Sequence, residues 1–150
     1  MKRILASLFT ISILTVSNAA FAAIGYVDYS YISKNYPLAQ KYTQTLKTKN
    51  AAIVTYAKQK DNQVKAAKTQ AEKAKIRKEG IAQVQAKQKE VISLKQKYEA
   101  ELEAKVAAAA EKVRVQKKLD MIVKKDARVA GGVNCTNDVL NILKNPLAAK

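Results

Sequence analysis

The sequence predicts a mostly α-helical protein with a small β-containing body, an α+β fold in which a long antiparallel helical hairpin stands on a short-stranded base. Residues 38–117 contain no proline and only one glycine, and they are rich in Ala, Lys, Gln, Glu and Leu, which are strong helix formers. Short alternating segments with β character flank this stretch at residues 24–28 and 119–123. A helical arm closed at its base by strands from both ends of the chain accounts for these observations.

Residues 1–22 have the pattern of a secretory signal peptide. Two basic residues precede an apolar run at residues 4–16, and residues 20–22 (Ala-Phe-Ala) place small side chains at positions −3 and −1 of a cut before Ala23. The apolar run is shorter than the ~20 residues of a membrane-spanning helix, so a retained membrane anchor is the weaker alternative. We expect cleavage after Ala22 and export to the periplasm.

The chain is strongly basic, with 28 Lys and Arg against 12 Asp and Glu and a net charge of +16. Removal of the signal peptide takes away two basic residues and no acidic one, which leaves a net charge of +14. Such a charge is typical of proteins that bind nucleic acid, but the signal peptide and the absence of any recognisable nucleic-acid-binding motif argue against that function. We therefore expect partners in the cell envelope and no nucleic acid.

The residue inventory argues against enzymatic activity. The chain has no histidine, and Cys135 is its only cysteine, which excludes a His-based catalytic triad, a His/Cys zinc site and an intramolecular disulfide. Gly131 and Gly132 are not followed by the Gly-Lys-Ser/Thr of a phosphate-binding loop. We expect no enzymatic activity, no cofactor and no metal site, and we interpret Cys135 as a small, partly buried residue, with an intermolecular disulfide as the alternative.

The proposed arm, residues 37–117, carries two series of positions with alternating steps of three and four, the spacing of a coiled-coil seam. The first series comprises Tyr42, Leu46, Lys49, Ile53, Tyr56, Lys60, Val64, Ala67 and Ala71. The second comprises Ile81, Val84, Gln88, Val91, Leu94, Tyr98, Leu102, Val106, Ala109 and Val113. One unbroken helix of this length would reach ~120 Å, whereas an antiparallel hairpin lets each half bury the seam of the other.

Two sites compete for the tip of the hairpin. Thr69 and Glu72 have the spacing of a capping box, in which a Thr hydroxyl and a Glu three residues later satisfy the first free N–H groups of a helix. Gly80 is the one residue of the arm that readily adopts the left-handed conformation that ends a helix. We favour a tip at residues 66–69, with Gly80 as the alternative.

The body is assigned to residues 23–36 and 118–150. Its predicted elements are two or three strands, at residues 24–28 and 119–123 with residues 127–130 as the third candidate, then the turn glycines Gly131 and Gly132. A last helix is predicted at residues 139–144, capped by residues 136–138 and stopped near Pro146. So small a core is marginal alone, and we expect its apolar edges to be buried between subunits. The candidate oligomerisation residues are Ile24, Tyr26, Leu119, Met121, Val123 and Leu140.

Three pieces in order resemble the Skp/OmpH family of periplasmic chaperones: the signal peptide with the opening strand and residues 29–37, the long charged helical hairpin, and the closing segments at residues 119–123, 127–132 and 138–143. The resemblance implies a homotrimer whose arms enclose a cavity. It also implies an ATP-independent holdase that binds unfolded outer-membrane proteins, and an association with lipopolysaccharide or anionic lipid surfaces. The arms look somewhat shorter than those of the best-known members.

The distal part of the arm is the candidate binding surface for such clients or surfaces. Residues 38–80 carry a net charge of +8, against +3 for residues 81–117. The candidate binding residues are Lys65, Lys68, Lys73, Lys75, Arg77 and Lys78. Two alternatives stay open: these cations are a solvated surface that keeps the arm soluble, or the protein is a structural or adaptor coiled coil of the envelope that holds no clients.

Overall fold

The computed structural model describes residues 23–145, so the predicted signal peptide and Pro146 lie outside the described residues. The elements in order are β1 (Ile24–Val27), α1 (Tyr29–Asn35), α2 (Pro37–Ala66), α3 (Gln70–Gln116), β2 (Met121–Lys124), a 3-10 turn (Lys125–Ala127), β3 (Val133–Asn134) and α4 (Thr136–Lys144). The chain is mostly helical with a small sheet, which confirms the predicted α+β class.

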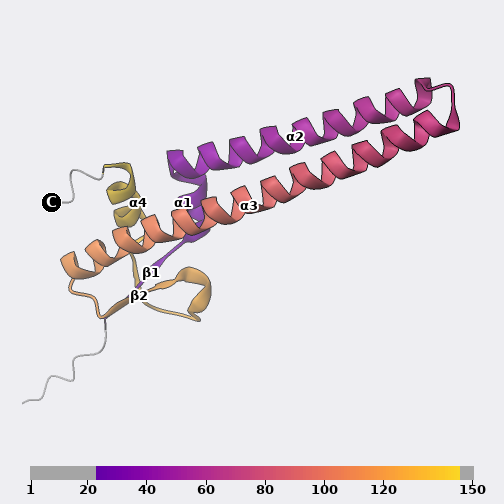
Figure 1. Ribbon diagram of the computed structural model, residues 1–150. Helices are drawn as coiled ribbons and strands as arrows, with labels where there is room; N and C mark the ends of the chain where they lie inside the picture. The colour runs from indigo at the N-terminus through magenta and orange to yellow at the C-terminus, as the bar shows by residue number, and fades with distance from the viewer. Residues whose placement is uncertain (1–22, 146–150) are drawn as a thin grey trace, which may run out of the picture.

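Helices α2 and α3 lie side by side and run in opposite directions, with their connection at the end far from the sheet (Figure 1). The rings of Tyr42 and Tyr98 stack near the base with centroids 3.9 Å apart. Nearer the tip, a Cβ built on Gly80 would lie 3.3 Å from Lys60 Cβ. We call α2, the connecting loop and the part of α3 beside α2 the arm. At ~1.5 Å per residue, α2 is ~45 Å long.

The connecting loop consists of residues 67–69, the first of the two sites considered from the sequence. The backbone N–H of Glu72 donates to the Thr69 hydroxyl over 3.2 Å, and the N–H of Thr69 donates to the Glu72 carboxylate over 3.2 Å. This reciprocal pair is a capping box. Gly80 lies inside α3, where it is buried.

The predicted seam needs a correction in α3. Ile81 and Gln88 are exposed, whereas their preceding neighbours Gly80 and Lys87 are buried and half-buried. The face of α3 that packs on α2 therefore includes Gly80 in place of Ile81, and Val84 follows four residues later. The sequence pattern gave the wrong position because isoleucine outranks glycine in any count of apolar residues, although close helix packing favours the smaller one.

The body is built on a three-stranded parallel sheet of order β2-β1-β3. Ile24 pairs with Met121 and Tyr26 with Val123 in one ladder, and Gly25 pairs with Val133 in the other. The predicted pairing of the first strand with segments after residue 118 is confirmed. The order requires the chain to return to β1 twice, so the central strand is the one nearest the N-terminus.

The core of the body lies between this sheet and the helices. Val27, Ile32, Val106, Val113 and Val139 are each at most 1% exposed and belong to one apolar cluster with Ala109, Leu119 and Cys135. Because α3 supplies three members of that cluster, its last turns belong to the body. The boundary between arm and body therefore lies within α3, earlier than the division predicted after residue 117.

Several predicted details of the body are wrong. Residues 127–130 form no strand, because a 3-10 turn follows β2 and β3 begins only at Val133, after two glycines with positive φ. Residues 29–35, for which no helix was predicted, form α1, whose first turn is capped when Tyr31 N–H donates to Asp28 Oδ1 over 2.9 Å.

Helix α4 also starts earlier than predicted, at Thr136. The Thr136 hydroxyl accepts a hydrogen bond from the backbone N–H of Asp28 over 3.0 Å, so it ties α4 to the end of β1 instead of capping its own helix. The backbone N–H of Thr136 donates to Asn134 Oδ1 over 3.0 Å. Because the Thr136 hydroxyl already binds the backbone of Asp28, it is not available for the helix cap that the sequence suggested.

Gly25 is the tightest position of the body, and its substitution tests the packing. A Cβ on Gly25 would lie 2.8 Å from Leu119 Cδ1 and 2.9 Å from Cys135 Sγ. We expect Gly25→Ala to lower the free energy of unfolding by about 1–3 kcal/mol, measured by urea denaturation followed by circular dichroism.

Gly80→Ala is the matched control for this prediction. Its new methyl group would meet only the Lys60 side chain, and alanine recovers ~1 kcal/mol of helix propensity. We expect a smaller loss than for Gly25→Ala, or a gain. An unchanged stability of the Gly25→Ala variant would contradict the described packing of the body.

Candidate functional site

The six predicted binding cations gather around the end of the arm. Lys65 lies in the last turn of α2, Lys68 lies in the loop, and Lys73, Lys75, Arg77 and Lys78 lie in the first turns of α3. All are exposed except Lys73, which is half-buried. The structure therefore brings together residues that the sequence spreads over fourteen positions, because the chain reverses within residues 67–69.

The positive charge at the tip is largely uncompensated. Among residues 23–145, Lys65 is the member of this set with an ion pair, 2.6 Å from Asp61 of its own helix. Glu72 is engaged in the capping box, and residues 57–85 hold eight Lys and Arg against three acidic residues. We call this surface, made of the six predicted cations, the cationic tip.

The acidic side chains near the other end of α3 are paired instead. Glu103 lies 2.8 Å from Lys124 of β2, and Glu111 lies 2.7 Å from Arg114. In each case the cation lowers the pKa of the carboxyl group, chiefly through the side-chain hydrogen bond. Compensated charge at the base and uncompensated charge at the tip give the molecule a strong charge gradient along the arm.

An apolar groove of about 290 Å³ lies on the arm next to the cationic tip. Val64, Ile76, Ile81 and Val84 form much of its apolar wall, and Lys60, Asp61 and Arg77 contribute charged groups to its lining. Gly80 lies in the lining as well, and its missing side chain lets the two helices approach closely beside the groove, since a Cβ there would lie 3.3 Å from Lys60 Cβ. We call this feature the arm groove.

Sequence reasoning missed the arm groove, although its signals were present. Ile81 was assigned to the seam, but it is 59% exposed and lines the groove. The signal is a single glycine in a long helical stretch, followed by an isoleucine that falls outside the seam. Such a pair marks a place where two helices approach closely and an apolar side chain stays on the surface. The exact register of the two helices was needed to recognise it.

The base of the arm is held by an aromatic stack instead of a groove. Tyr42 stacks on Tyr98. Burial, and to a smaller extent a hydrogen bond with Glu101, raises the pKa of Tyr42 to about 12. Tyr56, in the middle of the arm, has the Nζ atoms of Lys60 and Lys87 at 5.7 and 5.6 Å from its ring centroid. Both tyrosines are half-buried, in line with packing inside the helix pair.

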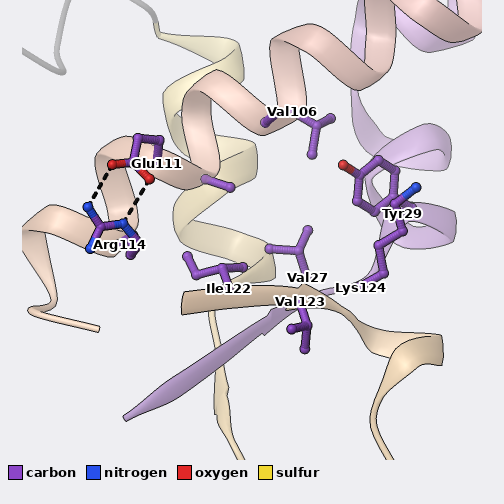
Figure 2. Close-up of a pocket in the computed structure, with 10 residues that line it drawn as sticks. Val27, Tyr29, Val106, Glu111, Arg114, Ile122, Val123 and Lys124 are labelled. Carbon is purple, nitrogen blue, oxygen red and sulfur yellow. Dashed lines mark hydrogen bonds and ion pairs between the residues drawn. The ribbon is translucent and has the colours of Figure 1, made fainter. Parts of the chain in front are cut away.

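A second hollow, of about 240 Å³, lies in the body between α3 and β2. Figure 2 shows Val27 and Ile122 pointing into it from the sheet and Val106 from α3, while Val123 points to the other face of the sheet. Its charged groups already have partners: Arg114 donates two hydrogen bonds to the Glu111 carboxylate (Figure 2), and Lys124 donates one to Glu103. This hollow is therefore an apolar space, and the charged side chains at its edge already form hydrogen bonds.

The six predicted oligomerisation residues divide into three pairs by their exposure. Leu119 and Leu140 are each 5% exposed, so the chain itself buries them. Ile24 and Met121, which are neighbours in the sheet, are 39% and 48% exposed. Tyr26 and Val123 are half-buried, and the Arg128 guanidinium lies 3.6 Å from the ring centroid of Tyr26.

Cys135 is fully buried in the body, and burial raises the pKa of its thiol. Both properties suit packing better than reactivity. Within residues 23–145, no group of three or more His, Cys, Asp or Glu side chains is placed to hold a metal ion.

Comparison of the chain with models of known protein families and with curated proteins found no match. Across the part of the chain that the structure describes, no helix combines the length and the apolar character needed to cross a membrane.

Removing the Thr69 hydroxyl tests how the tip is ordered. Thr69→Ala deletes the hydrogen bond that the backbone N–H of Glu72 donates to the Thr69 hydroxyl, while the backbone N–H of residue 69 stays available to the Glu72 carboxylate; we expect a cost of about 0.5–2 kcal/mol to the first turns of α3. Hydrogen exchange measured by mass spectrometry should show faster exchange at residues 70–76 and unchanged exchange in the body. Thr48→Ala, at an exposed position of α2, is the matched control, and equal exchange in both variants would contradict a role of the cap.

Proposed function

We propose that the protein is an ATP-independent periplasmic holdase chaperone that binds unfolded outer-membrane proteins in transit and prevents their aggregation. The observation that supports this most is the position of an apolar groove directly beside an uncompensated cationic surface, at the end of the arm. The resemblance of the sequence to the Skp/OmpH family points to the same function.

The chemistry of the two surfaces matches that of an unfolded barrel protein. Such a chain exposes alternating apolar strands whose free edges pair with one another and aggregate. A cationic surface speeds the capture of a client that carries acidic segments, although screening limits this attraction to ~8 Å at physiological salt. The arm groove then adds short-range apolar contact. Many weak contacts of this kind retain a chain without imposing a structure on it.

The proposal includes a homotrimer whose arms surround the client. Ile24 and Met121 leave apolar surface at one end of the sheet, and in the described part of the chain β2 and β3 each pair with β1 alone. Unpaired strand edges and exposed apolar side chains on so small a body favour association with further copies. Three arms on one base would place several cationic tips and arm grooves around one client.

The same cationic tip would also bind lipopolysaccharide or another anionic lipid surface. Each Lys or Arg near an anionic membrane surface contributes ~1 kcal/mol, and the tip is the part of the arm most remote from the sheet (Figure 1). This interaction would bring a loaded chaperone to the membrane with its tips forward. The alternative function, a structural or adaptor coiled coil of the envelope, needs neither the groove nor client binding.

Aggregation of an unfolded barrel protein diluted from urea separates these functions. We expect the purified protein to suppress light scattering at stoichiometric amounts and low salt. Reversal of the charge at Lys73, Lys75, Arg77 and Lys78 together should weaken capture and reduce its dependence on salt, because the long-range attraction is lost.

Reversal of Lys41, Lys47, Lys49 and Lys97 is the matched control, because these exposed lysines change the net charge equally and lie away from the tip. Both variants should sediment as the same oligomer as the unmodified protein. Unchanged scattering with the unmodified protein would leave the structural function as the better explanation. Equal weakening by both variants would contradict a specific role of the cationic tip.

Ile81→Gln tests the arm groove at little expense in stability, because Ile81 is 59% exposed. We expect client affinity to fall about fivefold, the effect of ~1 kcal/mol of lost apolar contact. Ile92→Gln is the control, since Ile92 lies on the same helix, is 57% exposed and does not line the groove. Fluorescence anisotropy of a labelled client measures both, and equal affinities for the two variants would exclude the groove as a binding site.

A further inference from the structure

The first described residue is tied to the body by two hydrogen bonds. The backbone nitrogen of Ala23 lies 2.7 Å from Asp120 Oδ2, to which it donates. The backbone N–H of Asp120 in turn donates to the carbonyl of Ala23 over 3.0 Å. Ile24 and Met121, the next residues of both segments, are the first pair of the parallel ladder. Ala23 and Asp120 therefore extend the ladder by one step toward the N-terminus.

Ala23 is also the residue that the signal sequence places first in the mature chain. Hydrolysis of the Ala22–Ala23 peptide bond adds one water molecule: the carbonyl carbon of Ala22 takes the hydroxyl, and the nitrogen of Ala23 leaves as an amine. With an ordinary pKa of about 7.7–8.0, that amine is mostly protonated at neutral pH. A neutral amide with one N–H thus becomes an ammonium with three N–H groups and a positive charge, at the position that faces Asp120.

We propose that Asp120 is a binding site for the α-ammonium of the mature chain, so that removal of the signal peptide creates an ion pair that fastens β1 to the start of β2. The proposal rests on the export step of the proposed function and not on client binding. In the precursor the same atoms form an ordinary amide–carboxylate hydrogen bond. Processing therefore strengthens the closure of the base without moving any group.

The surroundings of Asp120 leave its carboxylate available for this role. Arg114, on the preceding helix, directs its guanidinium to the Glu111 carboxylate and to the Leu119 carbonyl, the latter over 3.1 Å. Among residues 23–145, the Asp120 carboxylate accepts a hydrogen bond from the backbone nitrogen of Ala23. Because Asp120 is exposed, the gain is that of a surface pair, about a two- to fivefold change in the unfolding equilibrium constant.

Intact mass measurement of the exported protein, followed by urea denaturation, tests the inference. The mass should correspond to a chain that begins at Ala23. That chain is then compared with the same chain acetylated at its α-amino group, which restores a neutral amide. We expect the unfolding equilibrium constant of the acetylated chain to be about two to five times larger, with the difference diminished in 1 M salt because exposed charges are then screened.

Two variants distinguish the ion pair from other effects of acetylation. Asp120→Asn keeps a side-chain acceptor but removes the charge, so acetylation should no longer change the unfolding constant. Asp126→Asn removes an exposed negative charge from the 3-10 turn, and acetylation should keep its full effect. A mature chain that begins at another residue, or an acetylation effect that persists in Asp120→Asn, would overturn the inference and leave the aggregation assay unaffected.

Discussion

The packing of β1 against the last turns of α3 is the contact on which the rest of the structure depends. Val27 on the strand and Val106 and Val113 on the helix are fully buried together, and Gly25 has no room for even a methyl group between Leu119 and Cys135. This contact continues a helix of the arm into the core of the body, so no linker separates the two. A force applied at the tip would therefore act on the core of the body.

Much of the fold could be predicted from local chemistry. The capping box of Thr69 and Glu72 marked the loop, and the β-forming residues near both ends of the chain marked two strands that do pair. The predictions failed where the conformation of a residue depends on a partner far away in the sequence. Thr136 was assigned to a helix cap, but the backbone of Asp28 recruits its hydroxyl. Residues 127–130 were predicted as a strand, although Val129 is the one strand-forming residue among them, and the paired segment begins only after Gly132.

Of the two surfaces that form the candidate site, the cationic tip was predicted from the sequence and the arm groove was not. The cationic residues were found because charge is visible in a sequence whatever the register of the helices. The arm groove was not found, because it depends on which residue of the Gly80–Ile81 pair faces α2. One step along a helix turns a side chain by about 100°, from 3.6 residues per turn, and that rotation moves Ile81 from the seam to the surface.

The order of strands in the sheet has a consequence for how the chain folds. Strand β1 is synthesised first, and its two partners begin about a hundred residues later, at Met121 and Val133. Helices α2 and α3 need only each other, and their first contacts close a loop of three residues. Local contacts form faster than distant ones, so we expect the arm to assemble before β1 finds its partners. In that order of events the protein would expose an unpaired strand of its own until the sheet closes.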